Sequence, residues 1–196
     1  LFLGQQGAAA LGLESVQVGS EVQDGSEVKE ALTRRLYEEK ESKWILDAVG
    51  RMPEDVREPK GMSIGEIQKL TDEILLRGEG YFRDYPDGKS ISKVIPAVCR
   101  IYLMNCNRHF IDSGRLFKER NGQDAPAAWT ATLKQNYFDR IHTLLDGELA
   151  KIGEEAGTPC ELVRLKADAF WHGQQYPRCI NEYKRILDGC PDAEDR

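Results

Sequence analysis

The sequence predicts an all-α protein, a helical bundle or short solenoid of about six helices. Apolar residues recur at three- and four-residue steps in several segments, which is the spacing of one helix face. Serine, proline and glycine residues stand where those segments begin and end. No segment alternates apolar and polar residues as a half-buried strand would.

Three parts are expected along the 196 residues. Residues 1–24 are rich in Gly, Gln, Ser and Val without a sustained period, which predicts an extended arm. This arm is either a disordered terminus or a tail along a partner, which Leu11 and Leu13 would then contact. Residues 25–157 are expected to form a bundle-like body, and residues 158–196 a helical hairpin.

The first helix is predicted from Ser26, a suitable cap, to Val49. Its apolar residues recur near helical spacing: Val28, Ala31, Leu32, Leu36, Ile45 and Val49. Gly50 and Pro53 follow, and together they stop the helix. Residues 52–60 form a connector rich in proline and charge.

The second helix begins with a capping box, because Ser63 and Glu66 stand three residues apart and can satisfy two backbone amides reciprocally. An apolar stripe follows: Ile64, Ile67, Leu70, Ile74 and Leu75. Gly78 and Gly80 are expected to end or loosen this helix. Residues 85–88, Tyr-Pro-Asp-Gly, predict a turn, since proline presets its backbone angle and glycine accepts a positive φ.

The third helix is expected to start near Ser90 or Ser92. Pro96 is compatible with this helix if it falls in the first turn. Its expected buried side comprises Val94, Val98, Ile101, Tyr102 and Met104. Gly114 either ends or interrupts this helix, and residues 121–122, Asn-Gly, predict a turn.

The fourth helix has the clearest periodicity, with Asp124 as its cap and Pro126 in its first turn. Its apolar residues follow at three- and four-residue steps: Trp129, Leu133, Tyr137, Ile141, Leu144, Leu145 and Ile152. It should end within residues 153–157.

Two short amphipathic helices, joined by residues 172–175, are predicted to complete the chain. Residues 158–159, Thr-Pro, open the fifth helix, and Pro177 lies in the first turn of the sixth. The fifth is apolar over much of its surface, through Leu162, Val163, Leu165, Ala167, Ala169 and Phe170. The sixth carries Ile180, Tyr183, Ile186 and Leu187, and Gly189 and Pro191 end it.

Residues 160–192 match one repeat signature at several positions. These are the small residues Ala167 and Cys179, the aromatic residues Phe170, Tyr176 and Tyr183, and the closing Pro191. The segment resembles a single tetratricopeptide repeat. It departs from the pattern at Val163 in place of tryptophan, Lys166 in place of leucine and Ile186 in place of a small residue, and no second copy precedes it.

The resemblance implies that the hairpin binds protein partners, often extended peptides or helices. An ordinary αα-hairpin that closes a helical domain is the alternative. From residue type and position, the expected partner-binding residues are Trp171, Gln174, Tyr176 and Arg178, with Arg164 as a charge contact.

The composition excludes several classes of partner. Hydrophobic residues make up 40% of the chain and charged residues 31%, which is typical of a folded, helix-rich soluble protein. The net charge of −6 offers no electrostatic footprint for nucleic acid. No run of about 18 apolar residues occurs, so no membrane-spanning helix is expected.

Five cysteines at irregular spacing do not form a recognisable disulfide framework. A reducing compartment, the cytoplasm or an organelle interior, is therefore favoured. A bridge from Cys160 to either Cys179 or Cys190 remains open for an oxidising compartment.

No pattern of residues predicts catalysis, a metal or a cofactor. Cys99, Cys106 and His109 would share a helix face, but seven-residue spacing separates the two thiols by more than about 10 Å along the axis. His142 and His172 could meet a cysteine only through tertiary packing. Residues 78–80, Gly-Glu-Gly, lack the strand and helix of a nucleotide fingerprint. The glutamates within residues 38–41 and 154–155 are expected on solvated faces.

These observations favour a non-catalytic scaffold or accessory subunit that mediates protein contacts in a larger assembly. One alternative is a peripheral subunit of an organellar membrane complex, energy-transducing or light-harvesting, whose partners are membrane-embedded. The apolar start of the chain motivates it. A small thiol enzyme is a third hypothesis.

Overall fold

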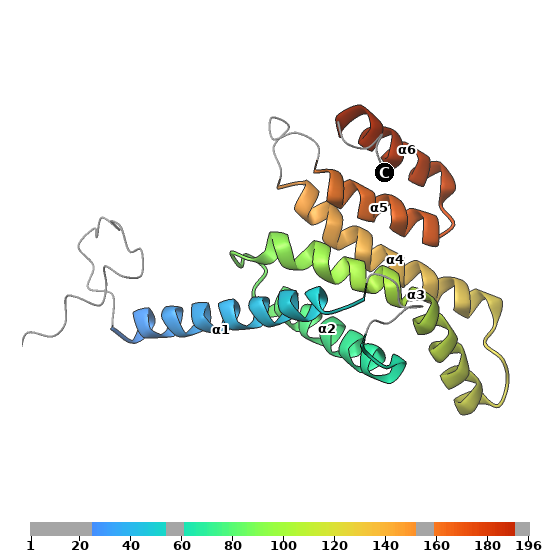
Figure 1. The fold of residues 1–196 in the computed structure, drawn as a ribbon. Helices are drawn as coiled ribbons and strands as arrows, with labels where there is room; N and C mark the ends of the chain where they lie inside the picture. The colour runs from blue at the N-terminus through green and yellow to red at the C-terminus, as the bar shows by residue number, and fades with distance from the viewer. Residues whose placement is uncertain (1–24, 54–60, 152–158, 191–196) are drawn as a thin grey trace, which may run out of the picture. The chain divides into compact units, whose positions relative to one another are not determined.

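The computed structural model describes residues 25–53, 61–151 and 159–190, and these residues confirm the all-α prediction (Figure 1). The described helices are α1 (Gly25–Gly50), α2 (Ile64–Asp84), α3 (Ile91–Asn121), α4 (Ala127–Leu149), α5 (Cys160–His172) and α6 (Tyr176–Gly189). The chain divides into two units, residues 1–36 and residues 37–196. None of the helices in the described ranges combines the length and apolarity needed to cross a bilayer.

The described part of the first unit is the N-terminal half of α1. Its apolar stripe is exposed: the exposed fractions of Val28, Leu32 and Leu36 are 46%, 43% and 66%. The sequence pattern was correct for a helix, yet no described residue covers this face. The arm with Leu11 and Leu13 lies outside the described residues.

Helix α2 begins as predicted and ends later than predicted. The Ser63 hydroxyl accepts from the Glu66 amide, and the Glu66 carboxylate accepts from the Ser63 amide at 2.7 Å, which completes the capping box. Gly78 does not end the helix. A Cβ at this position would lie 2.8 Å from a Val98 methyl carbon, so the absent side chain lets α2 and α3 approach closely.

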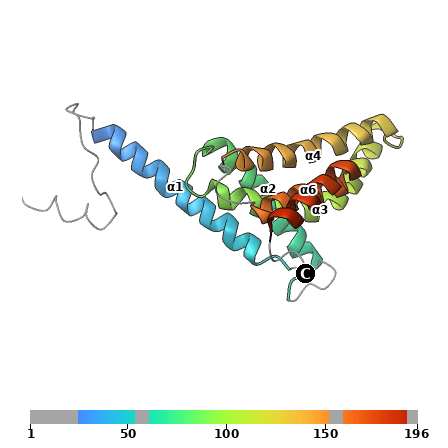
Figure 2. The same cartoon turned by 90° about the horizontal axis from the view of Figure 1, so that it is seen from above.

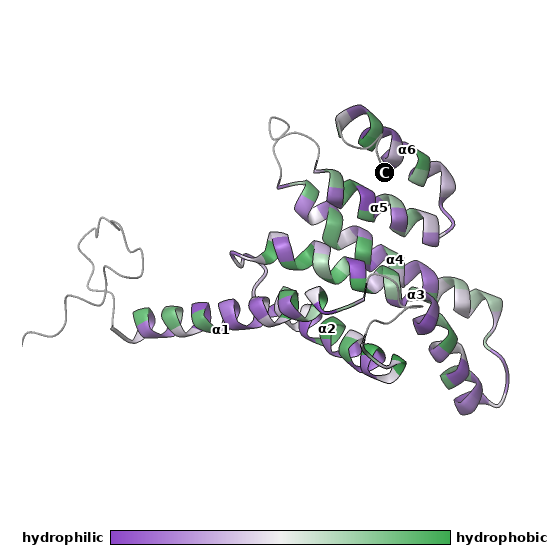
Figure 3. Cartoon of the chain, viewed as in Figure 1, coloured by the Kyte–Doolittle hydropathy of each residue, from purple (hydrophilic) through white to green (hydrophobic). Residues whose placement is uncertain are grey.

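Helix α3 forms the centre of the second unit, with Val94, Val98 and Ile101 fully buried as expected. Figure 3 shows hydrophobic residues along the first half of α3 and hydrophilic ones at its C-terminal end. Pro96 lies in the second turn rather than the first, and the helix continues past it. Gly114 does not interrupt the helix either, and Gly122, at a φ of 70°, provides its left-handed cap.

Helix α4 returns along α3, and Figures 1 and 2 both show the two helices meeting at the short connection between them. Its buried side includes Tyr137, Ile141 and Leu145, as predicted. The predicted cap is wrong: the N-cap is Pro126, and the Asp124 carboxylate pairs with the Lys118 ammonium at 3.1 Å.

Buried and half-buried polar groups connect the helices of the second unit. Glu38 is 9% exposed, so its predicted place on a solvated face is wrong. Its carboxylate accepts from the Tyr81 hydroxyl at 3.1 Å and from the Ser90 amide at 3.4 Å. Arg140 on α4 donates two hydrogen bonds to Glu79 on α2, at 3.0 and 2.6 Å. These partners satisfy charges that would otherwise be costly to bury.

Candidate functional site

Helices α5 and α6 form the predicted hairpin, and α5 is its inner helix (Figure 1). Ala167 and Ala169 are fully buried, so small side chains stand where α5 meets its neighbours. The buried side of α5 further includes Leu162, Val163, Leu165 and Phe170. Residues 173–175 connect the two helices, with Gln174 at a φ of 60°.

Helix α6 exposes its apolar stripe. Tyr176, Ile180, Tyr183 and Leu187 recur at helical spacing, yet they are 47%, 54%, 39% and 66% exposed. The buried residues of α6 are instead Cys179 and Glu182. An amphipathic helix normally covers its apolar stripe, so α6, like the N-terminal half of α1, presents an apolar face that no described residue covers.

The exposed stripe continues onto α5 through Trp171, which is 58% exposed. The rings of Trp171 and Tyr176 meet edge to face, with centroids 5.3 Å apart. We call Trp171, Tyr176, Ile180, Tyr183 and Leu187 the hairpin surface. Its five large apolar side chains come from adjoining helices, and the spacing of the four on α6 places them on one helix face.

Polar contacts hold the hairpin surface in place. The Tyr183 hydroxyl donates to the Asp168 carboxylate at 2.7 Å. Partial burial, together with this carboxylate, raises the pKa of Tyr183 to about 12, so the hydroxyl stays protonated near neutral pH. Arg164 and Lys184 are exposed and make no ion pair among the described residues, so both cations are available to a partner.

A partly buried ion network attaches α6 to the rest of the unit, beside the buried Cys179. The Lys166 ammonium bridges Glu182 at 3.1 Å and Asp146 of α4 at 2.7 Å. Arg185 also pairs with Glu182, at 2.7 Å. Lys166 stands where the repeat signature has leucine, so this departure exchanges an apolar contact for an ion bridge across three helices.

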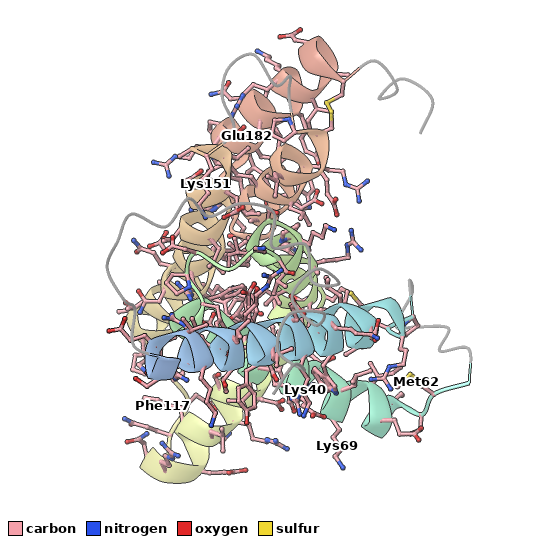
Figure 4. The ribbon with its side chains drawn as sticks, turned by 90° about the vertical axis from the view of Figure 1, so that its left-hand side faces the viewer. Lys40, Met62, Lys69, Phe117, Lys151 and Glu182 are labelled. Carbon is pink, nitrogen blue, oxygen red and sulfur yellow. A yellow bond between two sulfur atoms is a disulfide. The ribbon has the colours of Figure 1, made fainter. Side chains whose placement is uncertain are left out.

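A disulfide between Cys160 and Cys190 closes the base of the hairpin. This pairing is one of the two bridges that the sequence left open, and Cys99, Cys106 and Cys179 are free thiols. Figure 4 draws it as a yellow bond and labels Glu182 on the same hairpin.

The structure unites some of the predicted binding residues and separates others. Trp171 and Tyr176 lie in contact, and Gln174 is exposed in the connector between them. Arg178 lies on a different side of α6, where its guanidinium donates to Gln175 and lines a separate hollow. Arg164 acts electrostatically on Tyr183, which places it beside the hairpin surface.

Sequence reasoning missed Ile180, Tyr183 and Leu187 as surface residues. Their spacing was visible, but a stripe that faces a partner has the same spacing as one that faces the core. The ion network of Glu182 was the missing information, because it shows which side of α6 points inward.

The free thiols have no environment that activates them. Cys106 lies 4.0 Å from the Nδ1 atom of His172, so tertiary packing does bring this histidine to a cysteine. Burial nonetheless raises the pKa of Cys106, and it raises that of Cys99 to about 12. A reactive cysteine needs a lowered pKa instead. Among the described residues, no three His, Cys, Asp or Glu side chains gather as a metal site.

Comparison with known proteins leaves the hairpin as the main guide to function. Neither a protein-family model, nor a curated protein, nor a solved structure matches the chain.

Proposed function

We propose that the chain is a non-catalytic interaction subunit whose hairpin surface binds an amphipathic helix of a protein partner. One observation carries this proposal: α6 buries Cys179 and Glu182 while it exposes the regular stripe from Tyr176 to Leu187. A stripe at helical spacing matches a second helix laid along it, since ridges of side chains then fit the grooves between them.

The energetics favour a covered hairpin surface. Burying an aliphatic or aromatic side chain such as Ile180 or Leu187 is worth about 1.5–3 kcal/mol. Trp171 and Tyr176 add the residue types that dominate binding energy at interfaces. Several such side chains together can exceed the entropic cost of association, which a single exposed leucine cannot.

The charges beside the hairpin surface favour an acidic partner helix. Arg164 on α5 and Lys184 on α6 are exposed and unpaired among the described residues. Asp168 is already engaged by the Tyr183 hydroxyl. Glutamate or aspartate beside the apolar stripe of the partner would therefore complement the hairpin.

The protonated state of the thiols supports the non-catalytic part of the proposal. Burial raises the pKa of Cys99, Cys106 and Cys179, so none is held as a thiolate near neutral pH.

The proposal can be tested with the full chain and a yeast-displayed library of helical peptides. Each peptide carries apolar residues at positions i, i+4, i+7 and i+11, with Glu, Lys or Ala randomised beside them. We expect enrichment of peptides with Glu beside the stripe. Ile180→Asp should weaken the enriched peptides at least tenfold, because it places a charge in the middle of the hairpin surface.

Leu76→Asp is the matched control, because Leu76 is 76% exposed on α2 and lies outside the hairpin surface. It should leave peptide affinity unchanged. Failure to enrich any helix, or equal binding to both variants, would overturn the proposal. So would self-association in light scattering that Ile180→Asp abolishes, because the occupant would then be a second copy of this chain.

A further inference from the structure

A second site lies on a different side of α6 from the hairpin surface. A hollow of about 260 Å³ is bounded by α4, α5 and α6. At 3.6 residues per turn, Arg178 and Glu182 point away from Ile180 and Leu187, so the hollow and the hairpin surface do not share a wall. The volume falls below the range of about 300–1,000 Å³ that is usual for drug-sized ligands, so it fits a smaller molecule.

All but two of the charged side chains that line the hollow are held in ion pairs. The Lys166 ammonium lies between the carboxylates of Asp146 and Glu182, and Arg185 also pairs with Glu182. Asp146 and Glu182 are therefore both engaged, the second also by Arg185, which lies outside the lining of the hollow. Two other charged groups line the hollow, the Asp139 carboxylate on α4 and the Arg178 guanidinium on α6.

Asp139 and Arg178 lie on different walls and form no ion pair with each other or with another described residue. Arg178 donates one hydrogen bond, to the Gln175 side chain at 3.0 Å, which leaves most of its guanidinium donors available. The hollow thus presents one anionic and one cationic group to whatever enters it.

His142 provides an independent sign of a ligand. It lines the hollow, is only 9% exposed and stacks on Phe170, with ring centroids 3.9 Å apart. Both of its ring nitrogens are buried without a hydrogen-bond partner among the described residues. Burial lowers the pKa of His142, so the neutral ring offers one donor and one acceptor. A buried polar group in this condition requires an explanation, and a polar ligand supplies one when its binding opens a ring nitrogen of His142 to the hollow.

We propose that this hollow binds a small zwitterion of the α-amino acid class, with its carboxylate on Arg178, its ammonium on Asp139 and a polar contact to His142. A guanidinium matches a carboxylate geometrically, because two parallel N–H groups meet two oxygens. An aspartate in turn accepts from an ammonium. A simple anion would be repelled by Asp139 and a simple cation by Arg178, so only a ligand with both charges suits both walls.

The test uses the full chain and the common α-amino acids, first in thermal denaturation and then by NMR of the imidazole nitrogens of His142. We expect one or more amino acids to shift those resonances saturably. The N-acetyl and the carboxamide derivative of the best amino acid each lose one charge, and each should bind at least tenfold more weakly.

Variants assign the two charges separately. Asp139→Asn should weaken binding of the free amino acid at least tenfold and leave the affinity for the N-acetyl derivative unchanged. Arg178→Gln should weaken binding of the free amino acid and of the N-acetyl derivative, and leave the affinity for the carboxamide unchanged. Arg185→Gln is the control, since Arg185 pairs with Glu182 without lining the hollow. The proposal is overturned if no amino acid shifts His142, if the N-acetyl derivative binds as tightly, or if binding survives both wall variants. Asp139 and Arg178 are exposed, so their replacement does not threaten folding.

Discussion

Helices α3 and α6 both carry a regular apolar stripe, and they use it in opposite ways. On α3, Val94, Val98 and Ile101 are fully buried against neighbouring helices. On α6, Ile180 and Leu187 are 54% and 66% exposed, while a glutamate points inward. The first stripe contributes to folding of the chain itself, and the second is available to another molecule.

The contrast shows that amphipathicity alone does not determine which face of a helix packs. Helix α6 is attached by Glu182, Lys166 and the Cys160–Cys190 bridge beside the small buried Cys179, whereas large apolar side chains attach α3. Buried ion pairs give little net stability, but they fix orientation because an unpaired buried charge is costly. The network thereby keeps the hairpin surface outward.

Truncating a leucine in each region tests this contrast most strongly. Leu145 is fully buried on α4, and Leu187 is 66% exposed on α6. Leu145→Ala should lower the free energy of unfolding by about 2–5 kcal/mol, through lost transfer energy and the cavity left behind. Leu187→Ala should change it by no more than about 0.5 kcal/mol. Urea denaturation followed by circular dichroism at 222 nm measures both, and equal losses would mean that the α6 stripe is buried.

A pair of glycines probes how tightly the covered region is packed. Gly78→Ala should destabilise the chain by about 1–3 kcal/mol, because the new methyl group would overlap Val98. Gly114→Ala on α3 meets nothing within 4 Å and should stabilise by about 0.5–1 kcal/mol through helix propensity. The same urea titration applies. If Gly78→Ala is also stabilising, α2 and α3 are not in close contact.

Local signals in the sequence were sufficient for the helices and insufficient for their surroundings. The Ser63–Glu66 capping box involves residues three apart, so it could be read directly. The role of Gly78 could not be predicted from its neighbours in sequence, because it depends on Val98, which lies twenty positions away along the chain and on another helix. Glu38 was misplaced for the same reason, since Tyr81 lies 43 residues away. The outward stripe of α6 likewise depends on Lys166 and Asp146, which no periodicity in α6 reveals.

Alkaline pH gives a smaller and more specific test of burial. Burial raises the pKa of Cys99 from 9.0 to about 12, so the folded state retains a proton that the unfolded chain releases earlier. The resulting stabilisation is complete below pH 9 and is lost as the pH rises toward 12, by at most about 1.4 kcal/mol per pH unit. Cys99→Ala removes this dependence on pH. The difference in free energy of unfolding between the parent chain and the variant should therefore shrink between pH 7 and 10, because only the parent chain loses this contribution. A constant difference across that range would show that the Cys99 thiol titrates normally in the folded chain.

The Cys160–Cys190 bridge has a topological consequence for the hairpin. It joins the first residue of α5 to the cap of α6, so the whole hairpin lies inside one covalent ring. A single backbone cut within that ring, for example in the exposed connector at Gln174, leaves both fragments joined. In a chain cleaved there, the disulfide would still join α5 and α6 covalently, so the two helices would remain paired.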